Sequence, residues 1–269
     1  MMGDMLHYEF MQNAFIAVLL VTPLFGLLST MVVSNKMAFF ADSLGHGAFT
    51  GIAVGAIVGL VSPRVSLAIF SVAFAVAITW IKTHSRASTD TVIGVFSSTA
   101  IAIGLMIMSH GGGFNKYSSF LIGDILAITK SDIVALAVVF VAVVLIWGVL
   151  FNRLLILSIN APFAMSRGIS TFWVECAFAS LVAVVVSISI EWVGILIINS
   201  LLVLPAAAAR NVTNDVKSYT IVSVLIAMAS GVAGLTIAYE SDMAAGATIV
   251  TCAAVMFFVT MIMRARFIK

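Results

Sequence analysis

Charged side chains are scarce in this sequence of 269 residues, where Asp, Glu, Lys and Arg together make up only 9%. Hydrophobic residues make up 62%, and the mean hydropathy is +1.22. A soluble domain of this composition would expose large apolar patches to water. The scarcity of charge therefore excludes a soluble globular protein and indicates a polytopic membrane protein.

Cysteine is equally rare. The two thiols, Cys176 and Cys252, each lie within an apolar run. This setting is typical of buried, unreactive cysteines, so we expect neither a disulfide framework nor a thiolate metal site. A closed site of four thiolates holds Zn²⁺ tightly, and its absence favours a metal contact that can release its ion.

Nucleotide-binding motifs and catalytic constellations are missing as well. The glycine triplet at 111–113 follows no predicted strand, and no lysine stands after it at Walker spacing. The triplet is therefore typical of an exposed loop rather than of a phosphate cradle. We expect a protein that is not an enzyme, has no tightly bound cofactor and no nucleic-acid partner, and needs another chain for any ATP hydrolysis.

Apolar stretches long enough to cross about 30 Å of hydrocarbon recur along the chain. No Lys or Arg precedes the first one, so it lacks the basic region of a secretory signal and is expected to be retained. The sequence predicts an all-α, polytopic transmembrane helical bundle in a single domain, 1–269. Because Pro205 interrupts the seventh stretch, eight spans are an alternative to nine. The nine stretches are Phe15–Val33, Ala38–Leu60, Val65–Ile81, Val92–Ser109, Asp132–Phe151, Phe172–Ile190, Val193–Ala209, Ser218–Tyr239 and Ala244–Met263.

The basic residues indicate how these spans are oriented. With the N-terminus outside, ten of the 13 Lys and Arg residues fall on one face, and Arg64, Lys116 and Lys130 fall on the other. Cytoplasmic loops carry the excess of Lys and Arg in membrane proteins. The sequence therefore predicts an outside N-terminus and a cytoplasmic C-terminus.

The second predicted span contains an acid and an imidazole. Asp42 and His46 are four residues apart, so on a helix they lie on one face, and Thr50 continues the row by another turn. A neighbouring row, about 100° round the helix, is free of side chains and would let another helix backbone approach closely. That row consists of Gly47, Gly51, Gly55 and Gly59.

An acid at mid-span costs roughly 2.5–3.5 kcal/mol, so such a residue is a functional candidate by default. In one interpretation, Asp42 and His46 both bind a divalent cation such as Zn²⁺, Mn²⁺ or Fe²⁺, and other positions are left for water or other helices. In a second, Asp42 orients His46 or shares a proton relay with it. In a third, the two residues satisfy each other or nearby backbone and have a structural role.

The connection at 152–171 is the second informative region. It carries Arg153, Arg167 and Gly168, and it is long enough for a short amphipathic helix against the membrane face, with Gly168 as the stop. An ordinary loop between two spans is the alternative.

Several stretches then become recognisable together. The stretch FFADSLGHGAFTGIAVG resembles the second-span signature of the metal permeases of ABC importers, the ABC-3 family that includes zinc, manganese and iron permeases. The resemblance covers nearly the whole chain, and the order of the stretches makes it specific. The other similar stretches are Thr89–Gly104, Phe120–Thr129, Val193–Arg210 and Ala244–Val250.

This resemblance implies a homodimeric subunit of a bacterial plasma (inner) membrane, with a type II importer-like bundle and a path for divalent metal near the dimer interface. It implies two copies of a cytoplasmic ABC ATPase and an extracytoplasmic metal-binding protein as partners. Asp42 and His46 become the expected metal contacts. A permease for metal chelates of the cobalamin or siderophore type, or a proton-coupled secondary cation carrier, is the alternative function.

By the same resemblance, the segment 152–171 becomes the coupling segment that docks into the ATPase. Ala164, Arg167 and Gly168 are its expected central residues. The sequence departs from the family pattern in two places. Gly45 stands where serine often precedes the histidine, and Asn160 stands where an acid is often found.

Overall fold

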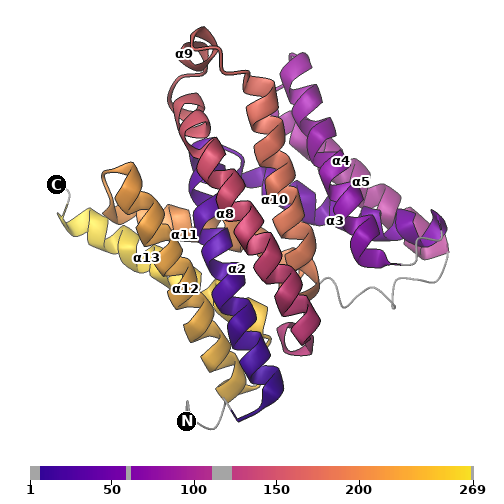
Figure 1. Ribbon diagram of the computed structural model, residues 1–269, viewed down its shortest axis with the longest axis vertical. Coiled ribbons are helices and arrows are strands. Elements are labelled where there is room, and N and C mark those ends of the chain that lie inside the picture. Colours follow the sequence, from indigo (N-terminus) through magenta and orange to yellow (C-terminus); the bar gives the residue numbers. More distant parts are fainter. Residues whose placement is uncertain (1–6, 59–61, 111–122, 268–269) are drawn as a thin grey trace.

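The computed structural model describes residues 7–58, 62–110 and 123–267, and within them the regular structure is helical (Figure 1). Gly59, Lys116 and the glycine triplet at 111–113 lie outside these residues. The expected all-α architecture is confirmed for the described part. The elements are α2 (Glu9–Ser34), α3 (Ala38–Val58), α4 (Pro63–His84), α5 (Thr89–His110), η1 (Ile125–Ala127), α8 (Lys130–Ile159), α9 (Ala161–Ser166), α10 (Thr171–Val193), α11 (Ile195–Val212), α12 (Val216–Ser241) and α13 (Ala245–Phe267).

Seven helices of the described chain are long and apolar enough to cross a membrane, fewer than the eight to nine spans that we expected. The long helices outside this set are α3 and α11. Both coincide with predicted spans, α3 with Ala38–Leu60 and α11 with Val193–Ala209.

Two helices form the centre of the bundle. In both α2 and α10, 67% of the most apolar window is buried, against 17% in α8 and in α13. Helix α2 packs against α12, α11 and α8, whereas α10 packs mainly against α4 and α8. The helices α8 and α13 therefore present most of their apolar surface outward, as lipid-facing or partner-facing helices do.

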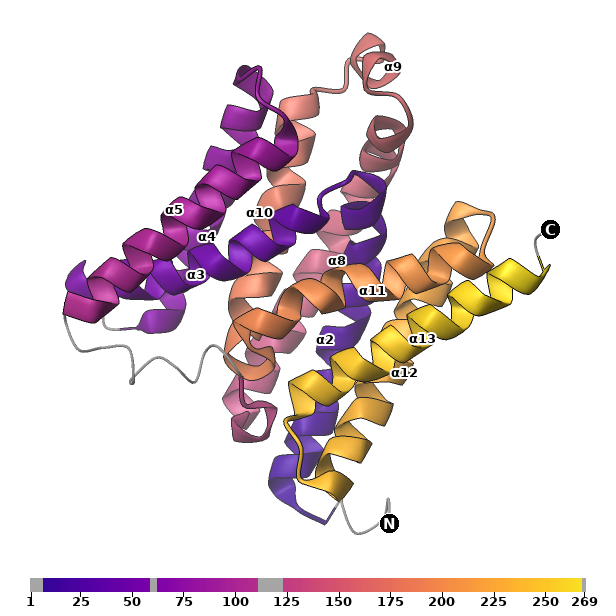
Figure 2. The ribbon, with the colours of Figure 1, turned by 180° about the vertical axis from the view of Figure 1, so that it is seen from behind.

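The remaining helices form two groups on either side of this centre. Helices α3, α4 and α5 lie together on one side, and α11, α12 and α13 lie together on the other (Figure 2). Contacts between α3 and α11 join the two groups. The helix with the polar pair thus lies where the two halves of the bundle meet.

The contact between α2 and α12 is so close that only glycine fits at Gly26. The Ser223 hydroxyl donates to the Gly26 carbonyl at 2.6 Å, and a Cβ on Gly26 would lie 2.7 Å from Val224 Cα. The obstruction is backbone, which cannot rotate away as a side chain can. Small residues at such crossings are a common way for membrane helices to pack.

Replacing Gly26 with alanine is expected to destabilise the protein by about 1–3 kcal/mol, because the added methyl group forces α2 and α12 apart. Thermal unfolding of the detergent-solubilised protein measures this effect. Gly148→Ala is the matched control, since a Cβ on Gly148 of α8 would meet nothing within 4 Å. Equal melting temperatures for the two variants would contradict the close contact.

Candidate metal-contact site

The glycine row of α3 packs closely against a neighbouring helix, α4, but it meets the side chains of α4 and not the helix backbone that the sequence led us to expect. A Cβ on Gly47 would lie 2.9 Å from the Phe74 ring, and one on Gly51 would lie 2.8 Å from Phe70 Cβ. The Ser66 hydroxyl also donates to the Gly51 carbonyl at 2.7 Å. Helix α4 therefore covers the glycine face and holds α3 at a fixed distance.

Two further contacts cover other sides of α3. The Thr50 hydroxyl donates to the carbonyl of Ala100 in α5, and Thr50 is 2% exposed. A Cβ on Gly45 would lie 3.3 Å from Ile195 Cγ2 in α11. Thr50 is thus used for packing, so the polar row expected at positions 42, 46 and 50 is reduced to its first two members.

Asp42 and His46 remain accessible on the side of α3 that these neighbours leave open. Their side chains are 45% and 31% exposed, respectively. At about 100° per residue, they point between the direction of Gly45, toward α11, and that of Thr50, toward α5. We call this surface the Asp42–His46 face.

The separation of the two side chains fits a shared ion better than a hydrogen bond. His46 Nε2 lies 3.6 Å from Asp42 Oδ2, beyond the 2.7–3.2 Å range of an N–H···O bond. Two donors that each bind one tetrahedral Zn²⁺ at about 2.1 Å are about 3.4 Å apart. The pair can therefore present one nitrogen and one oxygen donor to a single cation.

No third residue of the usual ligand types joins them in the described part of the chain, where no group of three or more His, Cys, Asp or Glu side chains could hold a metal ion. Two other acids near helix ends, Asp242 and Glu191, have different surroundings. Asp242 ends α12 in the left-handed conformation with φ 52°, and Glu191 is taken up by an ion pair. Neither supplies a further ligand to the pair.

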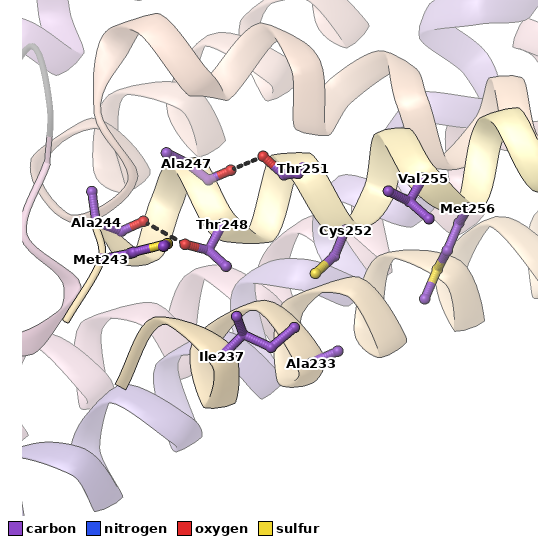
Figure 3. A pocket seen from close by; sticks show the side chains of 10 residues that line it. All are labelled: Ala233, Ile237, Met243, Ala244, Ala247, Thr248, Thr251, Cys252, Val255 and Met256. Atoms are coloured by element: carbon purple, nitrogen blue, oxygen red, sulfur yellow. Dashed lines mark hydrogen bonds between the residues drawn. The ribbon is translucent and has the colours of Figure 1, made fainter. Parts of the chain in front are cut away.

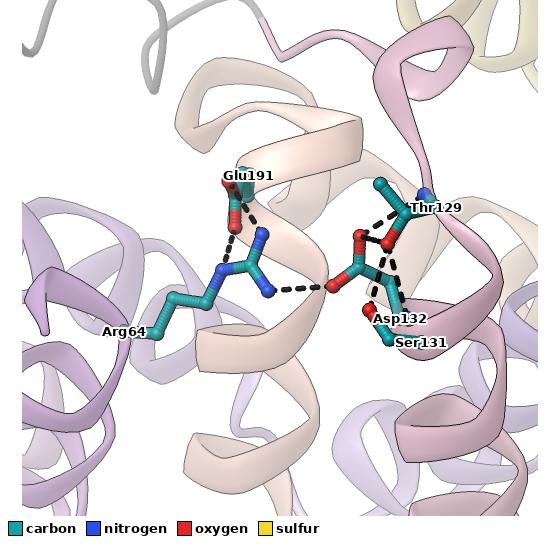
Figure 4. A network of polar contacts seen from close by, with 5 residues as sticks. All are labelled: Arg64, Thr129, Ser131, Asp132 and Glu191. Carbon is teal, nitrogen blue, oxygen red and sulfur yellow. Dashed lines mark hydrogen bonds and ion pairs between the residues drawn. The ribbon is translucent and has the colours of Figure 1, made fainter.

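The ion pair of Glu191 belongs to a network that the sequence did not reveal (Figure 4). Arg64 at the start of α4 binds Glu191 of α10 through two nitrogens, at 2.5 and 3.0 Å, and Asp132 of α8 at 2.5 Å. Asp132 also accepts from the Thr129 hydroxyl at 2.7 Å, which completes the cap of α8. The network ties α4, α8 and α10 together at one end of these helices.

The expected coupling segment contains a short helix, as predicted, although residues 152–159 belong to the end of α8. The Asn160 side chain accepts from the Phe163 backbone N–H at 3.0 Å and so caps α9. An acid would make the same cap, so the difference from the family pattern at this position preserves the local structure.

Helix α9 ends in a Schellman motif, which confirms Gly168 as the helix stop. Gly168 has φ 74°, its N–H bonds the Met165 carbonyl at 2.9 Å, and the N–H of Ile169 bonds the Ala164 carbonyl at 3.1 Å. Ala164 is fully buried and supports α9 from within.

Most of the large exposed side chains around α9 are apolar, and Arg167 adds a positive charge. Ile159, Phe163 and Met165 are exposed, and the Arg167 guanidinium lies 5.2 Å from the centroid of the Phe163 ring. The surface available to a partner therefore includes Arg167 but not Ala164.

A separate groove between α12 and α13 has a volume of about 540 Å³ (Figure 3). Its two hydroxyls, on Thr248 and Thr251, donate to the Ala244 and Ala247 carbonyls of their own helix. The rest of the lining is apolar apart from the thiol of Cys252. This groove offers no oxygen or nitrogen donor that is free to bind a cation, in contrast to the Asp42–His46 face.

Comparison with known proteins places this geometry in context. The model of the ABC 3 transport family matches residues 7–264. The chain is 28% identical to the high-affinity zinc uptake system membrane protein ZnuB of Haemophilus influenzae, over 89% of this chain and 92% of that protein. It is 24% identical to the manganese transport system membrane protein MntC of Listeria monocytogenes, over 95% and 91% of the two chains. A chain in the structure of PsaBC from Streptococcus pneumoniae in complex with Fab is 28% identical, with a TM-score of 0.81, over 97% of this chain and 95% of that one.

Proposed function

This chain belongs to the ABC 3 transport family, and we propose that it is the membrane permease of an importer for a divalent transition-metal ion, Zn²⁺, Mn²⁺ or Fe²⁺. The observation that carries the proposal is the Asp42–His46 pair, two donors 3.6 Å apart that stay accessible on a helix otherwise packed among apolar neighbours. An imidazole nitrogen with a carboxylate oxygen suits all three metals. The names of the zinc and manganese relatives support the same class of cargo.

The proposed assembly contains two copies of this chain, two copies of a cytoplasmic ATPase and an extracytoplasmic metal-binding protein. In Figure 1, α9 lies at one end of the molecule and the described N-terminal residues lie at the other. This arrangement supports an outside N-terminus with a cytoplasmic α9 that docks on the ATPase. The Asp42–His46 face would then line the metal path beside the second copy.

Metal import is tested by an uptake panel in a bacterial strain that lacks its own metal importers and receives this chain with its ATPase and binding protein. We expect uptake of free Zn²⁺, Mn²⁺ or Fe²⁺ that requires all three components. Uptake of cobalamin or a ferric siderophore without uptake of a free ion would favour the chelate permease instead. Metal uptake that persists without the ATPase would favour a proton-coupled carrier.

Reversing the charge of Arg167 is expected to weaken assembly with the ATPase and to leave metal binding unchanged. Arg167 is exposed at the end of α9, which packs against α8 and α10, so Arg167→Glu removes a cation from the proposed docking surface without touching the metal donors on α3. Co-purification of the ATPase with the tagged permease measures assembly. Wild-type recovery of the ATPase with Arg167→Glu would reject this docking surface.

A further inference from the structure

The side-chain carbonyl oxygen of Asn199 on α11 has no partner in the described structure, although the residue as a whole is only half-buried. The Oδ1 atom of Asn199 is inaccessible to solvent and accepts no hydrogen bond, whereas Asn211 of the same helix donates to the Thr260 hydroxyl at 3.2 Å. A buried carbonyl oxygen without a donor costs about 1–3 kcal/mol, so nearly all such groups are paired. Four other side-chain atoms of the described residues are also buried without a partner, and Asn199 Oδ1 is the only carbonyl oxygen among the five.

Asn199 lies beside the Asp42–His46 face. Ile195, one helical turn earlier in α11, is the residue that contacts Gly45. In Figure 2, α11 runs in the direction opposite to α3. Moving forward along α11 from Ile195 therefore corresponds to moving backward along α3 from Gly45, which brings the turn with Asn199 to the level of Asp42. Residues four apart share a helix face, with a rotation of about 40°. For antiparallel helices, this rotation turns Asn199 toward the side that Asp42 and His46 occupy.

A second polar side chain without a hydrogen bond in the described structure lies on α5. The Ser97 hydroxyl forms no hydrogen bond in the described structure and is partly buried. Hydroxyls in other helices, such as those of Thr22 and Thr79, donate to the carbonyl four residues earlier at 2.8 Å. Ser98 of α5 and Ser200 of α11 also form no hydrogen bond in the described structure, so it is the position of Ser97 that distinguishes it from them.

The neighbours of α5 determine where Ser97 points. Thr99 lines an apolar cavity of about 380 Å³ together with Phe70 and Phe74 of α4. Ser97 precedes Thr99 by two positions, which is a rotation of about 200° round the helix. Ser97 therefore lies on the side of α5 away from α4. Helices α3 and α5 run in the same direction (Figure 2), and Thr50 meets Ala100. Ser97 therefore lies near the level of His46, one turn before that contact.

We propose that Asn199 Oδ1 and Ser97 Oγ are further cation contacts, which complete a site with Asp42 and His46. The set contains one imidazole nitrogen and three oxygens of carboxylate, amide and hydroxyl type, with no thiolate. Such a set binds borderline and hard divalent cations and releases them more readily than a sulfur site does. This inference rests on the proposed function and specifies which helices supply the site: α3, α5 and α11.

The direct test is Mn²⁺ binding to the purified protein, followed by the electron paramagnetic resonance signal of free Mn²⁺. Asn199→Leu, which keeps the volume but removes the oxygen, is expected to raise the Kd at least about tenfold. It is also expected to leave thermal stability unchanged or higher, because an unpaired buried oxygen is lost. Asn199→Asp, which restores an oxygen, should recover binding, and Ser200→Ala on the same helix is the control that should bind normally.

Ser97→Ala is expected to weaken Mn²⁺ binding a few-fold, while Ser98→Ala, on the outer side of α5, should have no effect. Wild-type affinity in both Asn199→Leu and Ser97→Ala, with binding lost in Asp42→Ala, would overturn the present inference and spare the proposed function. Wild-type binding in Asp42→Ala and in His46→Ala would overturn the proposed function itself. A lower melting temperature for Asn199→Leu, with normal Mn²⁺ affinity, would show a purely structural asparagine and also overturn the inference.

Discussion

Metal uptake is expected to fall at least about 10- to 100-fold in cells that carry His46→Ala or Asp42→Ala. A loss of this size already follows when a residue that only supports a metal ligand is removed, so loss of a ligand itself should cost at least as much. Each substitution removes one of the two donors that lie 3.6 Å apart on the open side of α3. Both side chains are partly exposed, and neither forms a hydrogen bond in the described structure. The loss should therefore appear in radiolabelled metal uptake and not in the amount of folded permease in the membrane.

The neighbouring Thr50 provides the matched control for this prediction. Thr50 continues the same row but donates to the Ala100 carbonyl and is buried. Thr50→Val should retain most of the uptake and instead lower thermal stability, because the Ala100 contact to α5 is lost. Full uptake in both Asp42→Ala and His46→Ala would exclude these residues as metal contacts.

Reversing the charge at Arg64 is expected to destabilise the protein by about 1–3 kcal/mol, because the buried Asp132 carboxylate loses its charged hydrogen-bond partner. The Arg64 side chain is 55% exposed, which keeps the loss below that of a fully buried ion pair. Arg64 is the one cation that contacts both Asp132 and Glu191 in the described structure, and the Asp132 side chain is only 6% exposed. Arg64→Glu would place three carboxylates together at the junction of α4, α8 and α10. We expect little folded protein after detergent extraction, as measured by size-exclusion chromatography.

Arg64→Lys separates geometry from charge in this network. A lysine keeps the positive charge but cannot bind two carboxylates through a planar fork, so a smaller loss of about 1 kcal/mol is expected. If Arg64→Glu were extracted and eluted as the wild type does, the network would have no structural role.

The general architecture could be predicted from the sequence because membrane spans depend on long apolar runs. The boundaries of α5, α10 and α12 fall within a few residues of the predicted stretches. The close packing of the glycine row also followed from the spacing of Gly47 and Gly51, because small residues four apart form one helix face, but the spacing did not identify α4 as the neighbour or its side chains as the contact. The stop of α9 at Gly168 followed from the freedom of glycine to adopt positive φ.

Contacts between distant helices could not be predicted in the same way. Arg64, Asp132 and Glu191 are separated by at least 59 positions in the sequence, and nothing local shows that they meet. The four-residue spacing placed Thr50 on the same helix face as Asp42 and His46, but it could not show that α5 covers that position. Asn199 lay in an apolar run, and its unpaired oxygen becomes visible only once α11 is packed against its neighbours.

Asp42 and His46 are expected to contact the transported ion directly. Anomalous diffraction from crystals of the permease grown with Zn²⁺ tests this contact, because it locates the metal itself. The account predicts an anomalous peak about 2.0–2.2 Å from both His46 Nε2 and an Asp42 carboxylate oxygen. The peak should disappear in His46→Ala crystals grown under the same conditions. A zinc peak bound within the membrane-spanning region but away from both residues would contradict the account.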